Sequence, residues 1–476
     1  MSRRGKGNAD RSQEIMDRSS AISSERPRWI VGNELICNWL NVLLLHGSDP
    51  RWKNQRRVIN SYLTSVPRAD AGVPILQYET ARFLYDIANN PEAGQDGVRI
   101  LWLIARYTHS AFATQTFGMD VRALFTSSFT SSLGRPTDNS SDRYLTLMIL
   151  LLNIYMRQVW PRYWVGCTIP GMHMVDIFTW LNYLPLCLKP WERDARKRFK
   201  RDLEWCMARL ESIKDPAFAG QYMADAFLPS VIQASDRGGF TTEEEAAYLS
   251  LQLIIGAADT QKARAEIGAV VGDRLPDFAD QEHIPYIRCI VKELWRWRPP
   301  VSLGHPHVTT KAIIYKGQQI PKDARLHLNA WAISHDPKRH ENPDRFWAER
   351  YADDHTTTMQ SINSSDVTKR DHFAFGAGRR ICPGYHVAER SLAIAMMRIL
   401  WAFEVKWAEG TKHPVDQLTY TRRSEMPGNP SSRLPVALRV LNQKKAKIIN
   451  NTFQALQQER LPIVCQSVLK ATPLTL

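Results

Sequence analysis

The segment 375–384 constrains the fold and chemistry of this chain more than any other part of the sequence. It reads Phe-Gly-Ala-Gly-Arg-Arg-Ile-Cys-Pro-Gly and is followed by a long apolar stretch. Its glycines allow a tight turn and close approach to a flat ligand. Cys382 precedes a predicted helix, whose N-terminal dipole favours a thiolate, and Arg380 adds positive charge nearby. A thiolate held in this way suits haem iron as an axial ligand. The alternative is an inert buried cysteine beside a basic turn.

This segment resembles the haem-binding loop of the cytochrome P450 family, F-x-x-G-x-R-x-C-x-G. The five fixed positions are matched by Phe375, Gly378, Arg380, Cys382 and Gly384. The resemblance implies that these residues bind haem b and that Cys382 is the iron ligand. It also implies a P450 fold, which is mainly α with a minor β part.

Two further patterns resemble P450 motifs that stabilise the core behind the haem loop. Glu293 and Arg296 match E-x-x-R, and residues three apart share one helix face, where they can form a charge-assisted pair. Pro343-Asp344-Arg345-Phe346 resembles P-E-R-F. We therefore expect a structural cluster of Glu293, Arg296 and Arg345. Taken alone, the first pair would be read as a surface salt bridge.

Residues 256–260, Gly-Ala-Ala-Asp-Thr, resemble the oxygen-activation motif of the family. By this resemblance Asp259 and Thr260 are catalytic and relay protons to bound dioxygen. Without the haem loop, Thr260 would be read as a helix-end residue that bonds its own backbone.

Three more residues are expected to bind the cofactor. Trp52 and Arg56 match W-x-x-x-R, whose side chains meet the haem propionates in the family, and their spacing places them on one helix face. His307 matches a position that often contacts a propionate. The alternatives are an amphipathic surface helix for the first pair and an ordinary strand histidine for the second.

The periodicity of the chain predicts mostly helices. Pro285 begins a helix with an apolar stripe and Pro299 ends it, another helix follows Gly384, and residues 312–320 predict a hairpin that turns at Lys316-Gly317. The apolar runs 39–45 and 145–156 are too short to span a bilayer and are interpreted as buried helices.

The 476 residues predict three parts: a polar flexible arm (1–28), a haem-thiolate monooxygenase domain (29–442) and a C-terminal tail (443–476). Seven cysteines without a C-x-x-C pair argue against a disulfide or zinc scaffold. Residues 1–29 lack the apolar core of a signal peptide.

Compared with the family, the chain is expected to be N-terminally truncated, with an incomplete early β-sheet. A gap after Thr260 would leave the C-terminal half of the central helix incomplete.

The resemblance is closest to filamentous-fungal members that oxidise secondary metabolites. It implies a monooxygenase that uses O2, takes electrons from NADPH–cytochrome P450 reductase and oxidises a small apolar substrate. The alternatives are a non-catalytic product of a truncated gene and a haem-thiolate isomerase or dehydratase.

The net charge of +14 suits an acidic partner, such as a reductase that docks around Arg379 and Arg380, and no motif indicates nucleic-acid binding. The family location is the endoplasmic reticulum membrane; without an anchor, the chain is expected to be soluble or peripherally membrane-bound.

Overall fold

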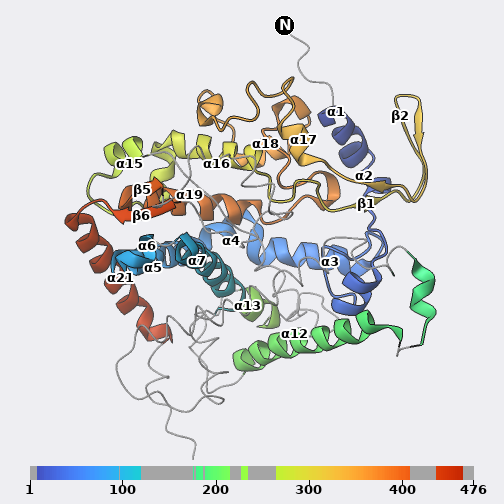
Figure 1. Ribbon diagram of the computed structural model, residues 1–476, viewed down its shortest axis with the longest axis horizontal. Helices are drawn as coiled ribbons and strands as arrows, with labels where there is room; N and C mark the ends of the chain where they lie inside the picture. The colour runs from blue at the N-terminus through green and yellow to red at the C-terminus, as the bar shows by residue number, and fades with distance from the viewer. Residues whose placement is uncertain are drawn as a thin grey trace, which may run out of the picture.

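The structure is a computed structural model that describes residues 8–95, 97–118, 175, 178–185, 188–214, 227–233, 264–407 and 436–464. The protein is mostly helical with small sheets, as predicted (Figure 1). The helices of four residues or more before residue 300 are α1 (Asn8–Ser12), η1 (Gln13–Arg18), α2 (Ser20–Ser23), η2 (Ile30–Ile36), α3 (Pro50–Ile59), η3 (Asn60–Thr64), α4 (Val66–Ala71), α5 (Val73–Ala88), α6 (Pro91–Gln95), α7 (Gly97–Phe117), η5 (Thr179–Tyr183), α12 (Pro190–Lys214), α13 (Phe227–Gln233), α15 (Arg264–Val271), η9 (Phe278–His283) and α16 (Pro285–Trp297).

The rest of the described chain holds the strands and the remaining helices. The strands are β1 (His307–Val308), β2 (Ile313–Tyr315), β3 (Gln318–Ile320), β4 (Arg325–Leu326), β5 (Phe403–Trp407) and β6 (Val436–Val440). The helices are α17 (Ala330–Ser334), η10 (Ala348–Tyr351), α18 (Thr358–Ile362), η11 (Val367–Lys369), η12 (Gly378–Arg380), α19 (Tyr385–Ala402) and α21 (Gln443–Val464).

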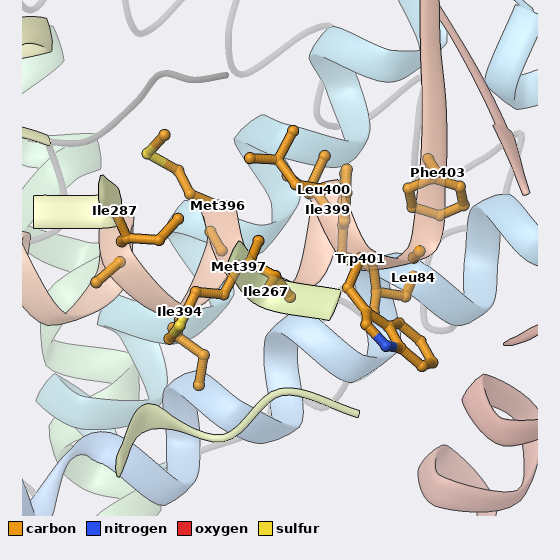
Figure 2. Close-up of a cluster of buried hydrophobic side chains, with 14 of the residues drawn as sticks. Leu84, Ile267, Ile287, Ile394, Met396, Met397, Ile399, Leu400, Trp401 and Phe403 are labelled. Carbon is orange, nitrogen blue, oxygen red and sulfur yellow. The ribbon is translucent and has the colours of Figure 1, made fainter. Parts of the chain in front are cut away.

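Helix α19 is the centre of the packing. It contacts α15 and α16 on one side and α5 on the other, and α12 lies at the opposite edge of the molecule (Figure 1). Its residues Ile394, Met396 and Met397 are completely buried, together with Leu84 of α5 and Ile287 of α16 (Figure 2). The apolar spacing predicted after Gly384 therefore forms a helix that is buried on several faces, and this helix begins directly after the candidate haem loop.

The strands form three two-stranded antiparallel sheets: β1 with β4, β2 with β3, and β5 with β6. The predicted hairpin is confirmed, and its turn residues Lys316 and Gly317 both have positive φ, 50° and 79°, as a tight hairpin turn requires. Among the described residues the first strand is β1, and Glu25 adds only an isolated bridge to Val308. The shortage of early strands is thus confirmed for these residues, whereas the expected gap after Thr260 lies outside them.

The predicted helix that begins at Pro285 is also confirmed. Pro285 occupies its first turn, where a missing N–H costs little, and Trp297 ends it before Pro299. Ile287, Val291 and Trp295 form its buried stripe.

Two segments differ from the expected arm and tail. Residues 8–23 are helical rather than a flexible arm, because Ala9 and Met16 pack with Phe373 and Ala377 in one apolar cluster. Residues 443–464 form α21, which packs on α5 rather than lying outside the fold. There Phe453 stacks near Tyr85, with ring centroids 4.6 Å apart.

The apolar run 39–45 is largely buried as expected, but it is not helical. Asn38 and Trp39 have positive φ, which breaks a right-handed helix, and turns follow up to Leu45. The second run, 145–156, lies outside the described residues. No helix in the described part of the chain is long and apolar enough to cross a membrane.

The completely buried Ile394 tests the importance of the α19 core. We expect Ile394→Ala to lower the free energy of unfolding by about 2–5 kcal/mol, because truncation removes apolar contacts and leaves a cavity. Ile314→Ala on β2, where the side chain is 65% exposed, is the matched control and should change stability by less than about 0.5 kcal/mol. Urea unfolding of both variants measures the difference, and equal effects would contradict this packing.

Buried His340 predicts a pH dependence of stability. Burial, together with the positive charges of Arg339, Arg296 and Arg350, lowers the pKa of His340 from 6.5 to about 2. Below pH 6.5 the unfolded chain therefore binds a proton at this position that the folded chain does not. Stability should fall as the pH falls, with His340 contributing about 1.4 kcal/mol per pH unit until the pH nears its folded pKa.

Urea unfolding between pH 7.5 and pH 5 measures this contribution. His340→Gln should flatten the pH slope of stability by about one proton, and the same change at exposed His327 is the matched control. Parallel slopes for wild type and His340→Gln would show that this histidine is not buried in its neutral form.

Candidate haem site

The backbone of residues 375–384 folds into a compact loop ahead of α19. The N–H of Cys382 donates to the carbonyl of Phe375 (2.8 Å), and the N–H of Ile381 donates to that of Gly378 (3.1 Å). The ring of Phe375 meets the ring of Trp295 edge-on, with centroids 4.8 Å apart. The loop is thereby fixed both by its own hydrogen bonds and by α16.

Gly378 is required by a close contact that the sequence alone did not reveal. Its φ is +66°, and a Cβ added there would lie 2.0 Å from the carbonyl oxygen of Met16. Its N–H donates to Asp17 Oδ1 (2.7 Å). The expected role of this glycine was approach to a flat ligand, but what lies against it here is η1.

The side chain of Cys382 is exposed, yet its thiol behaves as a group surrounded by protein. Burial raises the pKa of this thiol, and a hydrogen bond from the N–H of Gly384 and the charge of Arg56 oppose that rise. Cys382 is thus open to solvent, while the protein atoms around it partly desolvate its sulphur. In the free thiol, burial outweighs the expected effect of the helix terminus; coordination to a metal would remove the proton.

Arg380 points away from solvent toward the early part of the chain. Its Nε donates to the carbonyl of Ser24 (3.1 Å) and its Nη2 to that of Leu45 (2.7 Å), while Nη1 is buried without a hydrogen-bond partner. Its guanidinium lies 4.1 Å from the ring centroid of Trp52, in a cation–π contact. Burial lowers the pKa of Arg380 to about 9.

Arg56 and His307 lie in the same neighbourhood. Both Trp52 and Arg56 belong to α3, where Asp49 caps the helix by accepting the N–H of Arg51 (2.9 Å). Burial lowers the pKa of Arg56 while the charge of Cys382 raises it. His307 Nδ1–H donates to the carbonyl of Ser23 (2.8 Å); burial and the charge of Arg26 lower the pKa of His307 to about 3, so its ring is neutral.

A third arginine of this group, the buried Arg26, belongs to none of the sequence motifs. Arg26 donates from Nε to the carbonyl of Leu43 (2.8 Å) and from Nη1 to that of Pro306 (2.6 Å), and burial and the charge of Arg380 lower its pKa well below the usual value. No pattern that we used marks Arg26, because it lies in the segment that was expected to be a flexible arm.

Glu25 supplies a negative charge next to these arginines. Burial would raise its pKa, but hydrogen bonds from His46 and from the N–H groups of Arg26 and Gly47 prevail and lower the pKa to about 2. The single negative charge of Glu25 does not balance the three guanidiniums of Arg26, Arg56 and Arg380, so this group of residues carries an excess of positive charge.

The residues of this cluster fit haem. An unpartnered buried N–H of Arg380 and an excess of guanidinium charge suit the paired carboxylates of a porphyrin, since such charges are costly to bury without anions. The thiol of Cys382, once deprotonated, has the chemistry of a soft ligand for iron. The structure thus brings together the predicted Trp52, Arg56, His307, Arg380 and Cys382. The predicted Asp259 and Thr260 lie outside the described residues.

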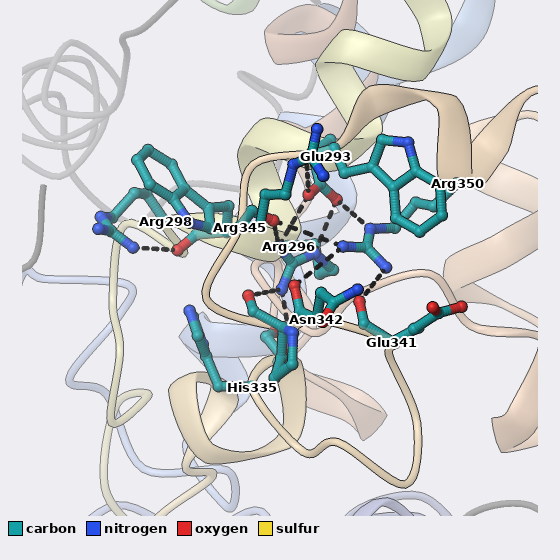
Figure 3. A network of polar contacts seen from close by, with 12 residues as sticks. Glu293, Arg296, Arg298, His335, Glu341, Asn342, Arg345 and Arg350 are labelled. Carbon is teal, nitrogen blue, oxygen red and sulfur yellow. Dashed lines mark hydrogen bonds and ion pairs between the residues drawn. The ribbon is translucent and has the colours of Figure 1, made fainter.

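The buried cluster behind the loop forms, but with a different third arginine. Arg296 donates from Nε to Glu293 Oε2 (2.7 Å) and from Nη2 to Oε1 (2.8 Å), and both side chains are completely buried (Figure 3). Arg350 donates from Nε to Glu293 Oε2 (3.0 Å). The expected member, Arg345, contributes only its backbone carbonyl, which accepts from Arg296 Nη2 (3.3 Å).

The presence of Arg350 in the cluster instead of Arg345 has a simple origin in the sequence. Asp344-Arg345-Phe346 and Glu349-Arg350-Tyr351 both follow the order acid, arginine, aromatic, five residues apart. The second copy lies on η10, which packs against α16, so Arg350 reaches Glu293 while the side chain of Arg345 is exposed. Sequence order alone could not choose between the copies.

The comparisons with known proteins identify the family of this chain. Residues 259–424 match the family model described as Cytochrome P450. A cytochrome P450 monooxygenase of Gibberella fujikuroi is 46% identical over 466 residues, covering 94% of this chain and 80% of the relative. The monooxygenase virE of Hypocrea virens is 30% identical over 426 residues, covering 86% and 70%. A solved zebra fish cytochrome P450 shares the fold, with a TM-score of 0.58, 18% identity and coverage of 85% and 87%.

The chain therefore belongs to the cytochrome P450 family. It is a fungal-type P450 monooxygenase whose cofactor is haem with thiolate ligation, and it uses O2 and a redox partner as the family does.

The two arginines make a matched pair for testing the buried cluster. We expect Arg350→Ala to lower the free energy of unfolding by about 1.5–3 kcal/mol, because the buried carboxylate of Glu293 loses a charged hydrogen bond. Arg345→Ala keeps the backbone carbonyl that Arg296 uses and should cost less than about 0.5 kcal/mol. Chemical denaturation of both variants measures the difference. A larger loss of stability in Arg345→Ala than in Arg350→Ala would show that the Arg345 side chain belongs to the cluster.

Proposed function

We propose that this protein oxidises a small apolar organic compound, a fungal secondary metabolite, with O2 and electrons from NADPH–cytochrome P450 reductase. The observation that carries the proposal is the exposed Cys382 thiol, which interacts with the charge of Arg56, while Arg380 stacks on Trp52 of the same helix as Arg56. The fungal relatives named as cytochrome P450 monooxygenases support the reaction class.

Each residue of the site has a separate task. Cys382 binds iron and donates electron density through its thiolate, and haem, when bound, supplies the oxygen chemistry. Arg56 and Arg380 neutralise the propionates, with Trp52 supporting Arg380 and His307 offering a neutral ring. Phe375 fixes the loop against α16.

We assign proton delivery to Asp259 and Thr260. Their side-chain types suit this task, because a hydroxyl beside a carboxylate can pass protons into an otherwise apolar pocket. The assignment rests on the matched motif alone.

The reductase would dock at the haem-loop face through Arg379. This side chain is exposed, whereas Arg380 turns inward to the carbonyls of Ser24 and Leu45. Of the two arginines expected to attract an acidic partner, only Arg379 is therefore presented for steering it.

Peripheral membrane contact is better supported at η5 than at residues 39–45, which are largely buried. Trp180 and Tyr183 of η5 are 61% and 87% exposed, and Phe178 and Leu188 beside them are also exposed. Trp and Tyr are the residues that favour the membrane–water interface. We place the membrane contact here, on the endoplasmic reticulum as in the family.

The reduced carbon monoxide difference spectrum of the haem-loaded chain tests the function. We expect the red-shifted Soret band of thiolate ligation in the wild type and its complete loss in Cys382→Ala, because the axial ligand is removed. Cys289→Ala, at a buried cysteine whose Sγ donates to the carbonyl of Tyr351, is the matched control and should keep the band.

The same preparation separates the reaction classes. NADPH oxidation that requires both reductase and O2 would support monooxygenation, while haem binding without it would favour an isomerase or dehydratase. A wild-type chain that takes up no haem would refute the proposal.

A further inference from the structure

The helical segment 8–23 is interrupted at the position where it meets the haem loop. Helices α1 and α2 are α-helical, but η1 between them is a π-helix, closed by an i→i−5 hydrogen bond from Ser19 N–H to Glu14 O (3.1 Å). Such wide turns are rare and often occur at functional sites, because they redirect side chains and carbonyls from the helical path. Here the π-turn contains Met16 and Asp17.

Asp17 joins two points of the segment that leads to the iron ligand. Its Oδ1 accepts the N–H of Gly378 (2.7 Å), and its Oδ2 lies 2.8 Å from Nη1 of Arg370. Gly378 lies four residues before Cys382, and Arg370 lies five residues before Phe375, where the haem loop begins. One carboxylate therefore spans both.

The contact is closely fitted. The carbonyl of Met16 leaves no room for a Cβ at Gly378, and the Met16 side chain packs with Phe373 and Ala377. The carbonyl of the same residue, Gly378, accepts the N–H of Ile381, so the glycine held by Asp17 is linked to the residue preceding Cys382. A shift of this glycine would be transmitted to the cysteine.

We propose that Asp17 is a positioning residue for the thiolate ligand: by holding the Gly378 amide it fixes the haem loop in the conformation that keeps Cys382 on the iron. The inference deepens the proposed function, on which it rests. It concerns a residue outside the haem loop and outside the motifs that define the site. The hydrogen bond to the amide is the acting contact, and the ion pair with Arg370 keeps the carboxylate in place.

Three variants of the haem-loaded full chain test this role. Asp17→Ala removes the contact, Asp17→Asn keeps an Oδ1 acceptor for Gly378, and Glu14→Gln removes a carboxylate from the same π-turn, where Glu14 pairs with Arg18 at the surface. The readouts are the rate at which the carbon monoxide complex loses its thiolate Soret band, the reduction potential and the thermal midpoint.

We expect Asp17→Ala to lose the thiolate band about tenfold faster than wild type, the change expected for one hydrogen bond to a charged acceptor, and to shift the reduction potential. Asp17→Asn should stay within about threefold of wild type, and Glu14→Gln should match it. If Asp17→Ala does not fold, Asp17→Asn still tests the amide contact, because a loss as fast as tenfold there would overturn the proposal.

The outcomes separate this inference from the function on which it rests. A lowered thermal midpoint in Asp17→Ala, with the rate and potential of wild type, would make Asp17 merely structural and overturn the inference alone. A wild-type chain without the thiolate band would overturn both.

Discussion

The buried ion pair between Glu293 and Arg296 organises the chain around the haem loop. Both side chains are completely buried, so each charge must be satisfied within the protein. Arg296 also donates to the carbonyls of Ser334 and Pro343 (both 2.9 Å), and Glu293 accepts the N–H of Trp347 (2.8 Å). One charged pair on α16 thereby fixes the end of α17 and the loop that leads from it to η10.

The haem loop depends on this framework and on the N-terminal segment. Phe375 packs on Trp295 of α16, the same helix that carries the ion pair, while Asp17 holds the Gly378 amide from the other side. Buried Arg26 and half-buried Arg56 and Arg380 repel one another, and Glu25 offsets only part of their charge. Such a cluster is costly without anions, which is why it argues for a dianionic cofactor.

The predictions succeeded where chemistry is encoded within a few neighbouring residues. The hairpin at Lys316-Gly317 and the helix starting at Pro285 depend on local backbone preferences, and both formed as predicted. The prediction that Arg345 joins the buried cluster was wrong because two acid–arginine–aromatic triplets are equivalent in sequence. Only the packing of η10 on α16 selects Arg350. The role of Arg26 was not predicted because its polar, charged neighbours in the sequence are typical of a solvated segment.

The sequence by itself determined the family and the helix that follows residues 375–384, since the identities and spacing of Phe375, Gly378, Arg380 and Cys382 match the haem-loop pattern of that family. The tertiary structure decided which distant groups complete the site. The carbonyl of Met16 explains the need for glycine at position 378, and Arg26 joins Arg380 across more than 350 residues. The physical reason is that burial is a property of the folded chain: a charged residue becomes a ligand, a structural ion pair or a surface group according to the groups that pack around it.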